Sequence, residues 1–125
     1  MKPSGTGIYK EEVLMATSDG FFEFIKEQLS GTEDITFRKM MGEYIIYYRE
    51  RIVGGLYDDR LLVKPVRAAS QLMPEAELQE PYESARKMLL VDNVDDREFL
   101  RELITAMYDE LPEPKKKKKG TNKER

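Results

Sequence analysis

The fold of this chain is decided by residues 38–65, which read RKMMGEYIIYYRERIVGGLYDDRLLVKP. Apolar residues of β-branched and aromatic type alternate with a period of two from Tyr44 to Tyr48 and resume at Ile52. Two polar residues interrupt the apolar runs at 49–50 and again at 58–59. Alternation that is broken by two-residue polar turns is typical of an antiparallel meander. The stretch therefore predicts three strands joined by two tight hairpins.

Three helices are predicted around this meander. The first spans about 19–29, with Ser18 placed as its N-cap. The second is short and lies between two prolines, at 65–74, with the first of them in its opening turn. The third covers 95–111, where Asp95 fits the N-cap of a capping box and apolar residues recur at helical spacing.

Two further strands complete the predicted fold. One covers 35–41, directly before the meander, and the other covers 87–92, directly before the third helix. The segment 75–86 is expected to be a loop. The order is then α-β-β-β-β-α-β-α, which predicts a two-layer α+β domain with helices on one face of a mostly antiparallel, five-stranded sheet.

The composition restricts the chemistry that is open to the protein. Its 125 residues suit one domain. They include no cysteine and no histidine, which removes disulfides, thiolate zinc sites and the usual general base together. We therefore expect that the protein is not an enzyme and that it has no catalytic residue, no metal site and no cofactor. No apolar run approaches the roughly 20 residues of a membrane span, and no signal peptide is visible, so a cytoplasmic protein is expected.

Charge is distributed unevenly along the chain. The net charge is −3, but residues 115–125 carry seven positive charges and one negative, so the other 114 residues carry a net −9. An acidic body repels phosphate backbones, whereas a basic tail attracts them. Lysine runs cannot bury enough apolar area to offset the entropy of ordering, so the tail is expected to be disordered.

These features predict three segments. Residues 1–14 form an N-terminal extension without periodicity, 15–112 form the folded domain, and 113–125 form the lysine-rich tail. Met15 is a candidate natural start, because a helix signal follows it directly. Mass spectrometry of the protein from its native host distinguishes Met15 from Met1.

The candidate contact residues are basic. Arg38, Arg60 and Lys64 could converge as a site for a partner or an anion, although a solvated sheet face explains them too. Alternation places Lys39 on the face opposite Arg38. In the tail, Lys115, Lys116, Lys117, Lys118 and Lys119 are a candidate tether for nucleic acid, with a non-specific affinity of roughly 10⁻⁴–10⁻⁶ M at best.

Other patterns have simpler explanations. The carboxylates around Asp95 fail the spacing of a calcium loop and suit helix capping. Asp58 and Asp59 suit a tight turn. Gly54 and Gly55 predict a bulge or the close approach of another element, here a helix. Four tyrosines could form a stacking platform for single-stranded nucleic acid, but an acidic body favours a core and rim role, or contact with a protein on an uncovered face. They are Tyr44, Tyr47, Tyr48 and Tyr57.

Three segments carry a family resemblance: RKMMGEYIIYY (38–48), GGLYDDRLLVKP (54–65) and MLLVDNVDDREFLRELI (88–104). They resemble the TfoX amino-terminal domain family, the Sxy-type regulators of natural competence, and the similarity covers about residues 21–111. The resemblance implies an α+β fold similar to secretion chaperones. It also implies a non-catalytic cytoplasmic regulator that works with the cyclic-AMP receptor protein. Competence regulators of this family carry a second, carboxy-terminal domain, so this chain resembles the single-domain members.

The expected function is therefore a non-enzymatic regulatory domain that acts through protein contacts in transcriptional regulation. The alternative is a nucleic-acid-associated protein that its lysine tail tethers without sequence preference.

Overall fold

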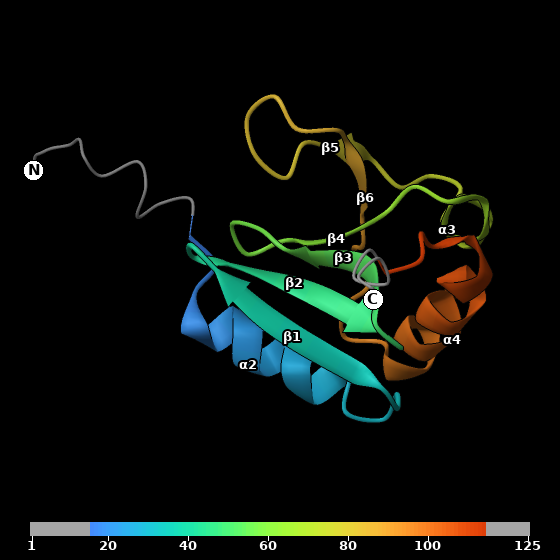
Figure 1. The fold of residues 1–125 in the computed structure, drawn as a ribbon, viewed down its shortest axis with the longest axis horizontal. Coiled ribbons are helices and arrows are strands. Elements are labelled where there is room, and N and C mark those ends of the chain that lie inside the picture. The colour runs from blue at the N-terminus through green and yellow to red at the C-terminus, as the bar shows by residue number, and fades with distance from the viewer. Residues whose placement is uncertain (1–15, 115–125) are drawn as a thin grey trace, which may run out of the picture.

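The computed structural model describes residues 16–114, which form a two-layer α+β domain, as predicted (Figure 1). Within this range, three α-helices accompany a six-stranded sheet. The predicted N-terminal extension and the lysine run lie outside the described residues. The elements, in chain order, are α2 (Asp19–Gln28), β1 (Ile35–Met40), β2 (Glu43–Tyr48), β3 (Arg51–Leu56), β4 (Leu61–Val63), α3 (Arg67–Leu72), β5 (Leu78–Gln79), β6 (Met88–Leu90), α4 (Arg97–Met107) and the 3₁₀ turn η1 (Tyr108–Glu110).

The sheet has the strand order β1-β2-β3-β4-β6-β5, and every neighbouring pair is antiparallel. The prediction of five strands was wrong by one, because β5 lies inside the segment that was expected to be a loop. In β5, Leu78 pairs with Leu89 and Gln79 pairs with Met88. Two residues are too few to show a period of two, so the sequence pattern could not reveal this strand.

Tight turns with left-handed backbone join the first four strands. Arg49 and Glu50 have φ of 51° and 71°, and Asp58 and Asp59 have φ of 54° and 57°. Positive φ at both central residues is what the two-residue hairpins favoured by strand twist require. Both predicted turns are thus confirmed. A third turn, between β1 and β2, consists of Met41 at φ 51° and Gly42 at φ 86°.

The glycines of β3 allow its neighbour to come unusually close. The register between β2 and β3 shifts at Ile46, so the predicted bulge is present. A Cβ at Gly54 would collide with the Leu62 carbonyl oxygen and lie 2.8 Å from Val63 Cα. The expectation of an approaching helix was wrong, because the element that occupies this space is the backbone of β4. Strand pairing at this distance leaves no room for a side chain.

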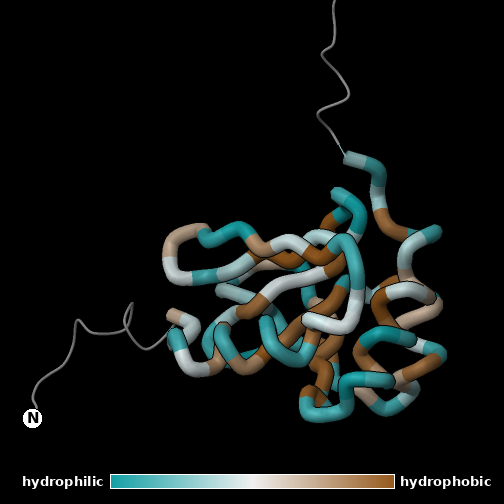
Figure 2. The backbone as a smooth tube through the Cα atoms, turned by 90° about the horizontal axis from the view of Figure 1, so that it is seen from below, coloured by the Kyte–Doolittle hydropathy of each residue, from teal (hydrophilic) through white to brown (hydrophobic). Residues whose placement is uncertain are grey.

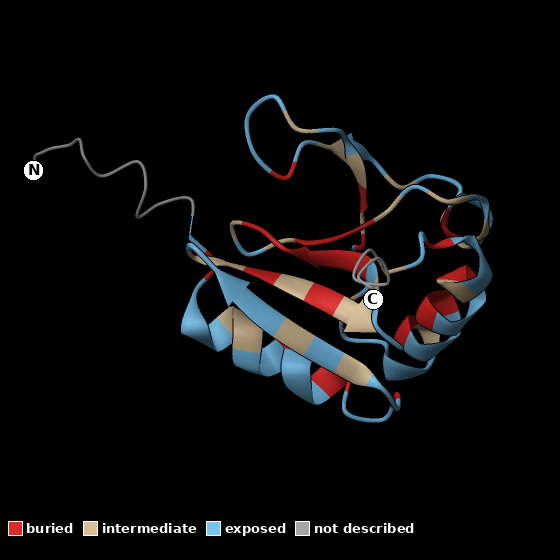
Figure 3. Cartoon of the chain, in the orientation of Figure 1, coloured by how far each residue is buried: buried red, intermediate tan, exposed pale blue. Residues whose placement is uncertain are grey.

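The helices cover one side of the sheet, called the inner face here, and the main core lies between them and the strands (Figure 2). Burial is greatest in the central strands, whereas β1 at the sheet edge is mostly exposed (Figure 3). Each fully buried leucine or isoleucine stabilises the fold by about 1.5–3 kcal/mol. The core includes Ile25, Ala69, Leu100, Leu103, Ile104 and Met107 from the helices and Tyr44, Ile46, Val53, Leu56, Leu61, Val63 and Leu89 from the strands.

Side-chain caps fix where the two longer helices begin. The predicted cap of α2 is confirmed, since Ser18 Oγ accepts a hydrogen bond from the Phe21 amide at 3.2 Å. The predicted cap of α4 was wrong by one residue. Asp96, rather than Asp95, accepts from the Phe99 amide at 3.1 Å. Two adjacent aspartates satisfy the capping pattern equally well, so only the backbone geometry separates them.

The short helix α3 also begins later than expected. Its N-cap is Val66, so Pro65 precedes the helix instead of occupying its first turn. The Ala68 amide near the start of α3 donates to Glu110 Oε1 at 2.9 Å, which links α3 to the end of the folded chain.

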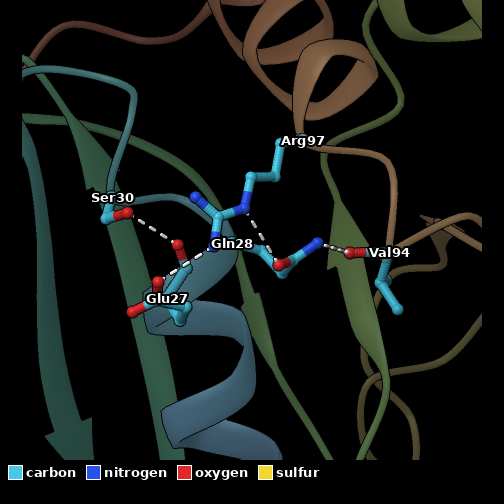
Figure 4. A network of polar contacts seen from close by, with 5 residues as sticks. All are labelled: Glu27, Gln28, Ser30, Val94 and Arg97. Atoms are coloured by element: carbon cyan, nitrogen blue, oxygen red, sulfur yellow. Dashed lines mark hydrogen bonds and ion pairs between the residues drawn. The ribbon is translucent and has the colours of Figure 1, made fainter.

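A polar network joins α2 to the start of α4 (Figure 4). Gln28 donates through Nε2 to the Val94 carbonyl at 3.0 Å and accepts from Arg97 Nε at 3.3 Å. Arg97 also forms an ion pair with Glu27 at 2.9 Å. Gln28 is only 9% exposed, so the two bonds satisfy polar atoms that would otherwise be costly to bury. The network fixes the two helices relative to each other.

Candidate partner-binding groove on the outer sheet face

Side-chain alternation divides β1 and β2 between two environments. Phe37 packs edge-on against Phe22 of α2, with ring centroids 5.3 Å apart, and Tyr44 stacks on the same ring at 3.9 Å. These residues therefore belong to the inner face. Arg38 and Tyr47, one position along from inner-face residues, belong to the opposite side, which we call the outer face.

An open groove of about 850 Å³ lies on this outer face. The first three strands and the segment after β4 form its floor and sides, and the end of the described chain forms a wall. Its lining residues are Thr36, Phe37, Arg38, Tyr47, Glu50, Ile52, Lys64, Pro112, Glu113 and Pro114, and among them the ring of Phe37 packs against Phe22 on the inner face.

Arg51 holds the C-terminal wall in place. Its guanidinium Nη1 donates to the carbonyl oxygens of Tyr108 and Leu111, each at 3.2 Å. The same group lies 4.3 Å from the Tyr108 ring centroid and 3.8 Å from the Glu113 carboxylate. Carbonyls at a helix C-terminus lack partners of their own, so one arginine satisfies them and directs the chain beyond α4 toward the groove.

Two basic side chains line the groove without a partner of their own. Within residues 16–114, the side chains of Arg38 and Lys64 have no ion pair, hydrogen bond or ring contact. Arg38 is exposed and Lys64 is half-buried. Lys39 points the other way, with its ammonium 5.8 Å from the Tyr44 ring centroid on the inner face. The predicted separation of Arg38 from Lys39 is confirmed.

The groove floor includes an apolar pair. Tyr47 of β2 lies directly opposite Ile52 of β3 in the sheet register. Tyr47 is half-buried. Ile52 is 39% exposed, although its side chain has no polar group that needs solvent. Charged groups beside an exposed apolar pair suit recognition of another chain, in which apolar contact gives affinity and charge gives orientation.

Arg60 does not join Arg38 and Lys64. It donates from Nε to the Tyr57 carbonyl at 3.0 Å and from Nη1 to Gln79 Oε1 at 2.9 Å. It also reaches the carbonyls of Glu80 at 3.1 Å and Pro81 at 3.2 Å. Every one of these acceptors belongs to this chain. Arg60 therefore fastens the β5–β6 loop to the sheet, and these bonds occupy the donors that a ligand would need.

This loop and the residues below it close the other part of the outer face. Leu62 is 0% exposed, although it lies on the opposite side of β4 from the core residues Leu61 and Val63. Tyr57 is 6% exposed, and its ring lies 6.3 Å from that of Tyr82 in the loop. We call the part formed by Tyr57, Arg60, Leu62, Pro81 and Tyr82 the closed half, and the part that contains the groove the open half.

Burial changes the acidity of two groups near the closed half. Burial raises the pKa of Tyr57 to about 12, and the Glu43 carboxylate and Tyr82 contribute in the same direction. Burial also raises the pKa of Glu43. Tyr57 lies against Gly55, where an added Cβ would be 2.8 Å from its ring and hydroxyl. The Tyr57 shift thus accompanies close packing over a glycine, and neither Tyr57 nor Glu43 lines the groove.

The four tyrosines do not share one platform. Tyr44 and Tyr48 belong to the inner face, where they pack against the core. Tyr47 lies in the open half and Tyr57 in the closed half. The stacking surface that was considered for single-stranded nucleic acid is therefore not assembled from these residues.

Several acidic residues of the described chain have structural contacts. Asp96 caps α4, and Asp59 Oδ1 accepts from the Ser18 amide at 2.8 Å, which ties a hairpin turn to the start of α2. Among residues 16–114, no group of three acidic side chains is arranged to hold a metal ion. No helix in the same range has the length and apolar character needed to span a bilayer.

Comparison with known proteins identifies the family of this chain. The model of the family described as the TfoX N-terminal domain matches residues 27–110, about two-thirds of the chain. The chain belongs to this family. This TfoX N-terminal domain is also 31% identical over 108 residues to a protein of Spirochaeta aurantia that is named "Uncharacterized 12.7 kDa protein in trpE 5'region". The match covers 86% of this chain and 94% of the relative. No solved structure matches the chain significantly.

Sequence reasoning missed several residues that shape the groove of this TfoX N-terminal domain. Alternation from Tyr44 and Tyr48 could have assigned Tyr47 to the outer face, and the turn at 49–50 could then have placed Ile52 beside it. No local signal could have located 112–114, because their position depends on a tertiary contact with Arg51.

Proposed function

We propose that this TfoX N-terminal domain is a non-enzymatic regulatory module of the cytoplasm, and that it acts by contacting another protein through the open half of its outer face. The observation that supports this most is the contrast within one sheet face. The chain covers the closed half with its own loop, whereas the groove keeps Ile52 exposed and leaves Arg38 and Lys64 without partners within residues 16–114. Surfaces that combine apolar exposure with oriented charge are typical of interaction sites.

The groove suits binding better than catalysis. Its charged groups are two cations, Arg38 and Lys64, and two carboxylates, Glu50 and Glu113. The chain has no histidine or cysteine to replace them as base or nucleophile.

The partner that we propose is a transcription factor. The family resemblance suggests the cyclic-AMP receptor protein, with which TfoX-type regulators work. A module of about 100 residues with an open groove of this kind would hold the partner at a single surface.

Site-specific photocrosslinking in the native host tests the proposal. Benzoylphenylalanine at position 52 places the crosslinker in the groove, and the same residue at position 24 is a matched control. Phe24 on α2 is 41% exposed, almost the same as Ile52 at 39%. We expect a discrete protein adduct from position 52 and none from position 24. Equal adducts from both positions, or none from position 52, would contradict the proposal.

A second candidate function is supported by the seven positive charges of residues 115–125. A tail of this charge would tether the protein to nucleic acid through phosphates, with a salt slope of about −5. Binding of duplex DNA at several salt concentrations, measured with and without residues 115–125, distinguishes the two functions. Steep, tail-dependent DNA binding favours the tether, whereas protein capture that persists after residues 115–125 are removed favours the protein-contact module.

A further inference from the structure

We propose that the open groove receives an extended, acidic segment of the partner protein. Its carboxylates pair with Arg38 and Lys64, and an apolar side chain lies on the pair formed by Tyr47 and Ile52. This inference rests on the proposed function and adds the chemistry of the ligand to it.

The first argument is charge. All residues outside 115–125 together carry a net −9, yet the groove has two cations with no partner in the described chain. Its acidic lining residues are Glu50 and Glu113. Glu113 is matched by Arg51 at 3.8 Å, and Glu50 has an interaction of its own. The groove is therefore a basic site on an acidic domain, and charge complementarity selects an anionic ligand.

The second argument is the position of the lysine run in the sequence. Pro114 lines the groove, and Lys115 follows it directly. Residues 115–119 are all lysine, so the sequence places five positive charges directly after a residue that lines the groove. These charges have the same sign as Arg38 and Lys64. They reinforce the attraction of an acidic ligand and oppose a basic one.

The third argument is shape. Thr36 and Arg38 line the groove and belong to β1, the first strand in the sheet order. Within residues 16–114, β1 pairs only with β2, so its other edge has no neighbouring strand. An exposed strand edge presents unpaired backbone groups that an extended segment can pair with. A groove whose lining includes this edge strand suits a peptide in extended conformation.

Other occupants fit less well. A nucleic acid would bring closely spaced phosphates toward a domain with net charge −9, and the groove offers the ring of Tyr47 alone among outer-face aromatics that line it. A second copy that paired through β1 would bring Arg38 and Lys39 close to their own counterparts. Like charges across paired strands are destabilising, and such cations are a known protection against edge pairing.

Titration of the ¹⁵N-labelled full-length protein with two capped octapeptides tests the inference. The acidic probe is DEVDEVDE, and its uncharged counterpart of almost equal shape is NQVNQVNQ. We expect the acidic probe to shift the backbone amides of Thr36, Arg38, Tyr47 and Ile52. The uncharged probe should bind about tenfold more weakly, because it lacks the charge-assisted contacts.

Charge reversal with a matched control identifies the residues responsible. The double variant R38E/K64E should lose at least about tenfold in affinity for the acidic probe. The control R86E/K87E has the same net charge but changes two exposed cations in the β5–β6 loop, which also have no partner within the described chain. It should retain affinity within about twofold, because screened long-range charge has a small effect. Equal losses in both variants, or shifts outside the groove, would overturn the inference.

Two further results would overturn it in favour of another occupant. One is tighter binding of a ten-nucleotide oligothymidine that shifts the same amides. The other is sedimentation of a dimer whose interface includes position 52. If the acidic probe fails but position 52 still crosslinks a protein in the native host, the proposed function stands and the acidic ligand is wrong. If both fail, the groove is not a protein-binding site.

Discussion

The two halves of the outer face differ in the hydrogen-bond acceptors that the described chain offers to the arginine in each. Arg60 in the closed half finds four acceptors within its own chain, at Tyr57, Gln79, Glu80 and Pro81. Arg38 in the open half finds none within residues 16–114. Both residues had looked equivalent in the sequence. The difference shows that an arginine becomes structural where a loop returns over it, and stays available for a partner where the sheet is left bare.

The largest effect on the two halves is expected from a substitution that pushes β3 and β4 apart. Gly54→Ala places a Cβ against the Leu62 carbonyl oxygen, which is backbone and cannot move aside cheaply. We expect a loss of at least about 3 kcal/mol in the free energy of unfolding, measured by urea denaturation. Gly20→Ala in α2 is the control. Its Cβ meets nothing within 4 Å, so alanine should stabilise the helix by up to about 1 kcal/mol. Similar effects at both sites would contradict the close approach of β3 and β4.

The two arginines themselves provide a more direct comparison. Arg60→Met should lower the free energy of unfolding by about 2 kcal/mol, because several loop carbonyls lose a charged donor. Hydrogen exchange of the β5–β6 loop should accelerate as well. Arg38→Met should change stability by less than about 0.5 kcal/mol, since it removes no hydrogen bond, ion pair or ring contact within residues 16–114. The contrast is wrong if the two substitutions cost the same.

High pH should loosen the closed half. The folded protein keeps the Tyr57 proton up to a pKa of about 12, whereas an unfolded chain releases it near 10. The stabilisation is therefore complete below pH 10 and is lost as the pH rises through 12, at a cost of about 2 kcal/mol. We expect Tyr57→Phe to show a shallower fall in unfolding free energy between pH 10 and 12 than the unchanged protein. Parallel curves would mean that the hydroxyl is not buried.

A smaller effect is expected at the open edge of the sheet. Met41 is 98% exposed and has φ of 51°, a conformation that is unfavourable for methionine and free for glycine. Met41→Gly should therefore raise the thermal midpoint, by the equivalent of about 1 kcal/mol. Glu23→Gly, at an exposed position inside α2, is the opposite control and should destabilise by a similar amount. A destabilised Met41→Gly variant would show that the methionine has a packing role.

Much of the fold was predictable because its signals are local. Alternation around Tyr44 and Tyr48 placed the meander, and the polar pairs at 49–50 and 58–59 marked its turns. Ser18 was identified as a cap because the pattern around it is unambiguous. The sixth strand was missed because two residues carry no period, and the cap of α4 was misplaced because Asp95 and Asp96 satisfy the same pattern.

The candidate site was predictable only in part, since it depends on contacts between distant segments. Periodicity placed Arg38 and Lys39 on opposite faces, which the structure confirms. Little that is local distinguished Arg60 from Arg38, because three of the four acceptors of Arg60 are about 20 residues away in the chain. The C-terminal wall of the groove was hidden for the same reason, as Arg51 binds a segment more than 50 residues further on.

The central claim is that the open half is a protein contact surface whose specificity comes from Arg38 and Lys64. The most direct test is the yield of the position-52 photoadduct when R38E/K64E is introduced into the same crosslinking protein. We expect the adduct to fall at least about tenfold while the unfolding free energy stays within about 0.5 kcal/mol. An undiminished adduct, or a loss that accompanies general destabilisation, would contradict it.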